Sequence, residues 1–325
     1  MRNKAIIDLR VIKNNAKTIR KMIGNSNFCA VVKDDAYGHG AVEVASSIYK
    51  IVDSYAVSIL EEAVELRNVG IDKDILILTP CFFEELERAI LYDLTLSVEN
   101  VKQLKEIKKV CKSLNKKVKV HIQFNSGMNR CGTNSIDEIM NMCKYAKYSK
   151  CIYVDGIYSH LGKPENKRAL KTQVNNFLLA INAALVYNKN IKTHISASGG
   201  VIQNQHFNMV RVGILLYGYK PFKCEINVKP AMKVEVPVIK YVTLKPFSRA
   251  LYGLKRSFTK KNLALIRLGY GDGLNRKKVH GQFSKKCMDM SLIDKSLIVD
   301  NKYIIDDFQK FAKDYHTIPY EIMVN

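Results

Sequence analysis

A lysine ends an apolar segment near the start of the chain. Residues 28–33 read FCAVVK, and the polar segment DDAYGHG follows at once. If the apolar residues form a buried strand, an unpaired ammonium group at its end is energetically costly. Lys33 is therefore either part of a salt bridge or an amine kept for Schiff-base chemistry. Its position alone does not choose between the two.

Other side chains capable of chemistry have ordinary structural explanations when each is taken alone. Tyr270 lies between glycines, as in a turn. His160 follows an apolar run, as a buried core histidine does, and Arg211 alone suits a surface salt bridge. Cys287 and Met288 suit the core of a β-rich domain. A function can be inferred only from the way these residues occur together.

The elements that must position these residues alternate along the first two-thirds of the chain. Short runs rich in β-branched residues predict strands, and amphipathic segments such as residues 99–114 predict helices between them. The predicted strands are residues 28–33, 54–58, 75–78, 94–98, 118–124, 156–159 and 194–196.

Strand–helix alternation at this spacing predicts an α/β fold with a parallel sheet. About eight such units fit before residue 220, which is the number that closes a (β/α)8 TIM barrel. After Pro221 apolar and polar residues alternate, as in antiparallel strands. We therefore expect a barrel at residues 1–225 and a mostly antiparallel β domain at residues 226–325. Because residues just beyond the strand ends line the active site of such barrels, Lys33 is expected there.

The segment VVKDDAYGHG, residues 31–40, resembles the signature of alanine racemases, which are pyridoxal 5'-phosphate enzymes of fold type III. The likeness runs nearly from end to end, and its further segments occur in the family's order. These segments are residues 7–9 with Asn14 or Asn15, 126–132, 159–160, 211–218, 269–273, 287–289 and 319–321.

The resemblance implies catalytic roles for four residues. Lys33 carries the cofactor and is one base, and Tyr270, contributed by the other subunit of a homodimer, is the base on the opposite face. Arg211 meets the pyridine nitrogen of the cofactor. His160 orients the neighbourhood of Arg211 and Tyr270.

The resemblance also implies a set of binding residues. Arg130 contacts the phenolic oxygen of the cofactor and lies close to the substrate carboxylate, as does the backbone at Met288. The residues implied to hold the phosphate are Tyr37, Ser198, Tyr320 and the backbone amides of Gly213 and Ile214.

These residue types suit racemisation. A proton must leave one face of Cα and return to the other, so two bases must flank the substrate. Free lysine and tyrosine have pKa values of about 10, and both values must be brought toward neutrality. Arginine only donates hydrogen bonds, so Arg211 leaves the pyridine nitrogen unprotonated and weakens the electron sink. A weaker sink suppresses transamination.

The sequence departs from the family pattern at several points. Asp34 and Asp35 replace a small residue and an asparagine, which places two carboxylates beside Lys33. Gln123 stands where many members carry a carbamylated lysine, and its amide is expected to hold Arg130 by a hydrogen bond. Ala197 replaces an asparagine. Residues 246–248 replace Pro-Gly-Glu, and the basic tail expected after Tyr320 is missing. These changes concern efficiency more than identity.

Composition limits the other function classes. The formal charge is +22, but the lysines are scattered along the chain, whereas a nucleic-acid groove would cluster them with stacking aromatics. None of the eight cysteines forms a C-x-x-C pair, and we expect reduced thiols, no disulfide framework and no metal site. The charged N-terminus and the lack of a long apolar run predict a cytoplasmic protein without a membrane segment.

The leading hypothesis is an alanine racemase that supplies D-alanine for peptidoglycan. One alternative among enzymes is a serine or broad-spectrum amino-acid racemase, because residues 196–200 and 212–217 resemble the corresponding segments of serine/alanine racemases. Another is a weakly active, diverged racemase. Tyr320 matches the bulkier residue of alanine-selective members. An alternative from another class is a non-catalytic barrel that binds pyridoxal phosphate, but such proteins lack the β domain and its tyrosine.

Overall fold

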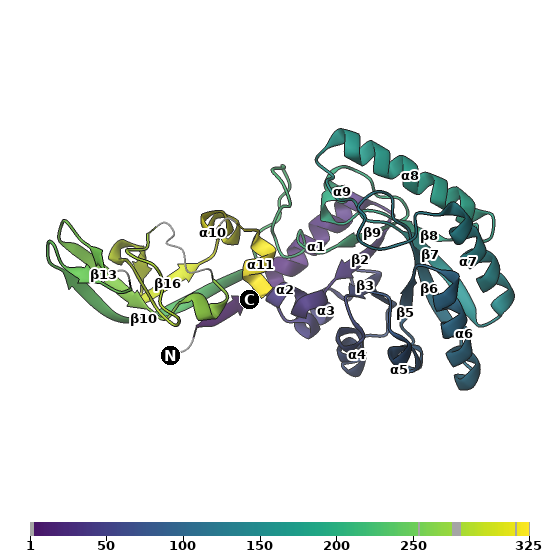
Figure 1. Cartoon of the computed structure of the whole chain (residues 1–325), viewed down its shortest axis with the longest axis horizontal. Helices are drawn as coiled ribbons and strands as arrows, with labels where there is room; N and C mark the ends of the chain where they lie inside the picture. Colours follow the sequence, from purple (N-terminus) through teal and green to yellow (C-terminus); the bar gives the residue numbers. More distant parts are fainter. Residues whose placement is uncertain (1–2, 253, 275–280, 316, 325) are drawn as a thin grey trace. The chain divides into compact units, whose positions relative to one another are not determined.

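The computed structural model describes residues 3–252, 254–274, 281–315 and 317–324 of the chain. The chain forms two compact units (Figure 1). One is Ile12–Lys229, and the other combines Met1–Val11 with Pro230–Asn325. Among the described residues, no helix is long and apolar enough to cross a membrane.

The larger unit is built on an eight-stranded parallel sheet with the strand order β8-β7-β6-β5-β4-β3-β2-β9. This arrangement confirms the predicted barrel, since the sheet curves round until β8 and β9 are close. The strands are β2 (Asn27–Val31), β3 (Ser54–Val57), β4 (Ile75–Ile77), β5 (Thr95–Val98), β6 (Val118–Gln123), β7 (Ile152–Tyr158), β8 (Lys192–His194) and β9 (Met209–Val212).

Helices connect the strands and lie outside them (Figure 1). They are α1 (Leu9–Ile23), α2 (Lys33–Gly38), α3 (Ala41–Ile48), α4 (Leu60–Asn68), η1 (Phe83–Glu85), α5 (Leu86–Leu91), α6 (Val101–Leu114), α7 (Ile136–Ser149), α8 (Lys167–Leu185) and α9 (Ser198–Ile202). The sequence dictates α6 locally: the Asn100 side chain accepts from the Gln103 amide at its start, and Asn115 ends it in the left-handed conformation.

Asn208 links the two strands at the seam of the barrel. Its side-chain oxygen accepts from the Thr193 amide at 2.6 Å, and its side-chain nitrogen donates to the Ile191 carbonyl at 3.0 Å. The Arg211 amide also donates to the Ser196 carbonyl at 2.9 Å. These bonds replace a regular ladder between β8 and β9 and fix Arg211 beside the end of β8.

The smaller unit is mostly antiparallel, as predicted. Its main sheet has the order β14-β13-β10-β16-β15, and β1 also pairs with β10. The strands are β1 (Lys4–Ile7), β10 (Met232–Leu244), β13 (Lys261–Ile266), β14 (Ser291–Asp294), β15 (Ile298–Val299) and β16 (Lys302–Ile305), with β11 (Arg249–Ala250) and β12 (Lys255–Arg256) as a separate hairpin.

The first strand belongs with the C-terminal part of the chain. Lys4–Ile7 pairs antiparallel with residues 232–235 of β10, and the Asp8 amide donates to the Ala231 carbonyl. Residues 1–11 therefore group with Pro230–Asn325, although the sequence reasoning assigned them to the barrel. The pairing joins residues more than two hundred positions apart, and no local pattern in residues 1–11 reveals it. The helices of this unit are η2 (Tyr270–Asp272), η3 (Lys295–Leu297), α10 (Phe308–Asp314) and α11 (Pro319–Val324).

Candidate active site

Lys33 lies two residues after the last residue of β2, Val31, at the carboxyl end of the barrel strands. Its ammonium nitrogen lies 3.0 Å from Oδ2 of Asp34, so one of the two adjacent carboxylates pairs with it. The other, Asp35, is used differently: its Oδ1 accepts from the Ala41 amide at 2.7 Å, at the first residue of α3. Only Asp34 thus adds a charge in contact with the lysine.

The backbone after Lys33 is left-handed over four residues, Asp34–Tyr37, with φ between 49° and 56°. None is glycine, and each such residue costs about 1–2 kcal/mol, so the surroundings must enforce this turn. Glu62 is one anchor: its Oε1 accepts from the Asp34 amide at 2.5 Å, and its Oε2 accepts from the Ser58 amide at 2.7 Å. The turn places Lys33 and Tyr37 in a fixed relation.

Tyr37 points its hydroxyl at Gly213. A β-carbon at Gly213 would lie 2.5 Å from the Tyr37 hydroxyl oxygen, so only glycine allows this approach without a shift. The Tyr37 ring lies 4.9 Å from the Tyr217 ring, and the Tyr217 hydroxyl donates to the Val31 carbonyl at 2.8 Å. The lysine's strand, the left-handed turn and the loop after β9 are thereby joined.

The loop after β9 presents amide groups that suit a phosphate. Gly213 and Ile214 are buried, and within the described residues their N–H groups make no backbone hydrogen bond. Buried partnerless amides are rare, and they favour an anionic ligand. Ser198 accepts from the Leu215 amide at 3.2 Å and so lies at the same loop. Tyr37, Ser198 and the two amides therefore fit the phosphate of the cofactor that the resemblance implies.

Arg211 is almost fully buried, at 3% exposure, and is held on several sides. Its Nη1 donates to Nδ1 of His194 at 2.5 Å, and its Nη2 donates to the Ser159 carbonyl at 2.7 Å. The guanidinium carbon lies 4.9 Å from the centre of the Tyr158 ring. Burial lowers the pKa of Arg211 to about 10, so the side chain remains a charged donor at neutral pH.

His160 lies among positive charges. Its Nδ1 is 3.4 Å from Nη2 of Arg211. Burial, followed by the charges of Arg211, Arg130 and Lys33, lowers the pKa of His160 to about 3. His160 is therefore neutral. The charges of Arg211, Arg130 and Lys33 all act on this one side chain, at the carboxyl end of the strands.

Gln123 does not hold Arg130, contrary to the expectation from the sequence. Both residues line a small pocket with His160 and Ser159. Oε1 of Gln123 is buried and has no hydrogen-bond partner among the described residues. Arg130 lies in an exposed loop between β6 and α7.

The predicted residues of the β unit form a second group. The Tyr270 amide donates to the Cys287 carbonyl at 3.0 Å, and the Gly271 amide donates to the Met288 carbonyl at 2.8 Å. A β-carbon at Gly269 would lie 1.9 Å from the Met288 oxygen, so this close packing requires glycine. The turn that carries Tyr270 is thus fixed against the backbone of Met288.

Two further predicted positions have plain local settings. Tyr320 lies in α11, and burial raises its pKa to about 12. Ala197 precedes α9 and offers no side-chain cap, so Ser198 is the first polar side chain of that helix. These observations do not test the roles that the resemblance implies for Tyr320 and Ser198.

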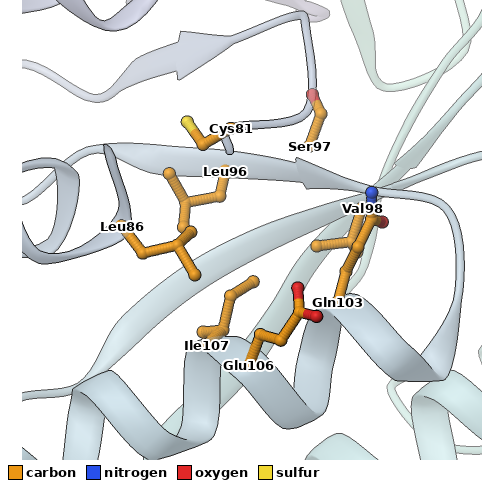
Figure 2. Close-up of a pocket in the computed structure, with 8 residues that line it drawn as sticks. All are labelled: Cys81, Leu86, Leu96, Ser97, Val98, Gln103, Glu106 and Ile107. Atoms are coloured by element: carbon orange, nitrogen blue, oxygen red, sulfur yellow. The ribbon is translucent and has the colours of Figure 1, made fainter. Parts of the chain in front are cut away.

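A hollow beside β5 is a feature of packing (Figure 2). It lies between the strand and the covering α5 and α6, and contains none of the predicted site residues. Its thiol, Cys81, has a pKa raised to about 12 by burial, so it is not a reactive thiolate. The residues that line it are Cys81, Leu86, Leu96, Ser97, Val98, Gln103, Glu106 and Ile107.

Several residues that shape the site were missed by the sequence reasoning. Glu62 anchors the left-handed turn, Tyr217 packs on Tyr37, and His194 accepts from Arg211. The only local signal was a polar side chain inside or next to an apolar run, as at His194 in the strand segment predicted at 194–196. Such a signal shows burial of a polar group but not its partner.

The fold and the site define a class: a (β/α)8 barrel enzyme with a lysine, a buried arginine and free amides gathered at the strand ends. Comparison with known proteins agrees with this class and narrows it. The sequence profile of the alanine racemase N-terminal domain matches residues 7–221.

Individual relatives extend the match over both units. The alanine racemase of Francisella philomiragia is 32% identical over 279 residues, covering 83% of this chain and 76% of the relative. The alanine racemase of Borreliella burgdorferi is 30% identical over 355 residues, covering 98% and 94%. The solved alanine racemase of Clostridium difficile 630 has a TM-score of 0.90 at 29% identity, with 100% and 93% covered. The chain belongs to the alanine racemase family.

Proposed function

We propose that the protein is a pyridoxal-phosphate-dependent alanine racemase that interconverts L- and D-alanine and supplies D-alanine for peptidoglycan in the cytoplasm. The observation that carries the proposal is the joint placement of Lys33, Tyr37, Arg211 and the Gly213–Ile214 amides at one end of the barrel. Family membership and the match over both units support it.

The residues of the barrel fit the cofactor. Lys33 is the amine for its covalent attachment, and Tyr37, Ser198 and the two amides hold its phosphate by charge-assisted hydrogen bonds. Arg211 donates toward the pyridine nitrogen, and Arg130 binds the carboxylate of the amino acid. Pyridoxal phosphate, when bound, withdraws electrons from the substrate Cα and makes its proton acidic.

The protein's own part in the reaction is to move one proton between the two faces of the substrate Cα. Lys33 Nζ takes or returns the Cα proton on one face, and the partner subunit's Tyr270 does so through its hydroxyl on the other. The resemblance to the family assigns the second base to the other subunit, so we include a homodimer in the proposal. Met288, whose backbone packs against the Tyr270 turn, contributes to the substrate end of the site.

Arg211 sets the electronic character of the site. Its Nη1 donates to His194 and its Nη2 donates to the Ser159 carbonyl, which fixes the guanidinium, and its pKa of about 10 keeps it charged at neutral pH. A group that cannot accept a proton leaves its acceptor unprotonated. The proton removed from Cα is therefore best returned there, and we expect little transamination.

A racemase assay on two substrates tests the proposal. The holoenzyme is incubated with L-alanine or L-serine, and the D-enantiomers are measured by chiral chromatography. We expect D-alanine to form faster than D-serine. Reduction with borohydride should fix the cofactor on the peptide that contains Lys33, where mass spectrometry detects it. Lys33→Ala should abolish both the activity and this adduct. Lys105 is an exposed lysine on α6, and Lys105→Ala should leave both unchanged. Full activity of Lys33→Ala would contradict the proposal, and faster serine turnover would assign the chain to serine racemisation.

A further inference from the structure

A chain of hydrogen bonds leads from Arg211 through the inside of the barrel. Nη1 of Arg211 lies 2.5 Å from Nδ1 of His194, and Nε2 of His194 lies 2.8 Å from Nδ1 of His121. Nε2 of His121 then lies 3.2 Å from Oδ2 of Asp155. The four side chains come from β9, β8, β6 and β7, and both histidines are nearly inaccessible, at 0% and 2% exposure.

The two ends of this chain fix the direction of every bond in it. Arginine only donates, so Nδ1 of His194 must accept and its proton must lie on Nε2. That proton is donated to Nδ1 of His121, whose own proton is therefore on Nε2 and is donated to Asp155. An ionised carboxylate only accepts, so the direction is the same from either end.

Burial and charge keep the groups in these protonation states. Burial lowers the pKa of His121 and, more strongly, that of His194, so both rings are neutral. Burial alone would raise the pKa of Asp155, but the hydrogen bonds and charges of His121 and Lys192 outweigh it and lower the pKa, so Asp155 is held ionised. Nζ of Lys192 lies 2.7 Å from Oδ2 of Asp155 and 3.2 Å from Oδ2 of Asp74.

The backbone of β7 leaves room for this chain of hydrogen bonds from Arg211 to Asp155, which we call the relay. Strand β7 lies between the strands of the two histidines, and Gly156 is the residue beside His121. A β-carbon at Gly156 would lie within 2.6–2.7 Å of three atoms of the His121 ring, so the ring reaches His194 only because the residue is glycine.

A register shift places the carboxylate. Val120 pairs with Val154 but His121 pairs with Gly156, which leaves Asp155 as the extra residue of a β-bulge. Bulges change the direction of a side chain at one position of a strand. The bulge and the glycine together bring Asp155 and His121 into line with His194.

We propose that Asp155 and His121 are positioning residues for the active site: they hold His194 in the tautomer that accepts from Arg211 and so fix the guanidinium. Without the acceptor at Asp155, both rings can take their protons on Nδ1. His194 would then present N–H to the N–H of Arg211, and the guanidinium would shift. Whether the relay serves racemisation rests on the proposed function, whereas the protonation of the two rings is a property of the protein alone.

Nitrogen NMR of the cofactor-free protein tests the relay directly. Long-range proton–nitrogen spectra of ¹⁵N-labelled protein distinguish the two ring tautomers, and His121→Asn and His194→Asn assign the signals. We expect both rings to be neutral with the proton on Nε2. A proton on Nδ1 of either ring, or a doubly protonated ring, would overturn the proposal.

Three variants separate the acceptor from its surroundings. Asp155→Leu removes the acceptor, and the proton of His194 should leave Nε2, at least in part of the molecules. Asp155→Asn keeps a carbonyl acceptor and should preserve both tautomers. Asp74→Leu disturbs the same lysine, Lys192, without touching His121, and should also preserve them. An unchanged His194 in Asp155→Leu, or an equal change in Asp74→Leu, would overturn the proposal. If Asp155→Leu does not fold, the wild-type spectrum alone still tests the proposal, because it shows which nitrogen of each ring carries the proton.

Kinetics of the holoenzyme test the consequence for catalysis. A misplaced group remote from the reaction lowers turnover by about ten- to a hundredfold. We expect that loss in kcat for Asp155→Leu with little change in KM, and near wild-type kcat for Asp155→Asn and Asp74→Leu. Equal kcat in Asp155→Leu and the wild type would refute a positioning role. A wild-type protein with the expected tautomers but no racemase activity would instead refute only the proposed function.

Discussion

The approach of Tyr37 to Gly213 allows a sharp test of the phosphate site. Gly213→Ala adds a carbon that would lie 2.5 Å from the Tyr37 hydroxyl oxygen and 3.0 Å from its ring carbon Cζ. Gly213 is not among the described residues with positive φ, so alanine fits the backbone and the contact is what changes. Tyr37 must move, although its backbone lies in the left-handed turn and its ring packs on Tyr217.

The expected magnitude follows from one hydrogen bond. If the hydroxyl is displaced, its charge-assisted bond to the phosphate is lost, which costs about 1.5–3 kcal/mol. That loss corresponds to binding about ten- to a hundredfold weaker. Titration of the cofactor-free protein with pyridoxal phosphate, followed by fluorescence, measures it. Gly162→Ala is the matched control, because its β-carbon would meet nothing closer than 3.4 Å.

A double-mutant cycle decides whether the contact is the cause. Tyr37→Phe removes the oxygen that the new carbon would strike, and also removes the bond to the phosphate. In that background Gly213→Ala should weaken binding by far less than in the wild type, so the two effects should not add. If Gly213→Ala costs the same factor in both backgrounds, the hydroxyl is not part of the phosphate site.

Two more predictions concern stability and assembly. His39 is 2% exposed and burial lowers its pKa from 6.5 to about 4, so between these values only the unfolded chain binds the proton, and stability falls as the pH falls. His39→Phe should remove about 2 kcal/mol of the loss between pH 7 and pH 5 in urea unfolding, and an unchanged pH dependence would contradict the assignment. Mixing inactive Lys33→Ala and Tyr270→Ala should restore at most roughly a quarter of full activity, since about half the dimers then carry one good site of two. No recovery, with subunit exchange shown independently, would mean that each site is built within one chain.

The barrel could be predicted from the sequence because its strands are short apolar runs with helices between them. The run at 75–78 contains β4, and the amphipathic segment 99–114 contains α6. The prediction at 156–159 began too late, since β7 starts at Ile152. Tyr153 is exposed and Asp155 is charged, and both interrupt the apolar run although they belong to the strand.

The details that shape the site could not be predicted. The left-handed turn at Asp34–Tyr37 has no glycine to reveal it, and its anchor Glu62 lies in another helix. The sequence suggested an amide at Gln123 that holds Arg130, but the oxygen of that amide is buried without a partner among the described residues. Resemblance identified residue types at the site, whereas their contacts depend on elements that are distant in sequence.

The most direct test of the central claim is hydrogen exchange at the Cα of alanine in deuterated water. The wild-type holoenzyme should convert either enantiomer into the other, with deuterium from the solvent in the product. Tyr270→Phe should slow deuterium incorporation from one enantiomer far more than from the other, because it removes the base on one face only. An equal loss of exchange from L- and D-alanine in Tyr270→Phe would contradict two bases and point to a single one.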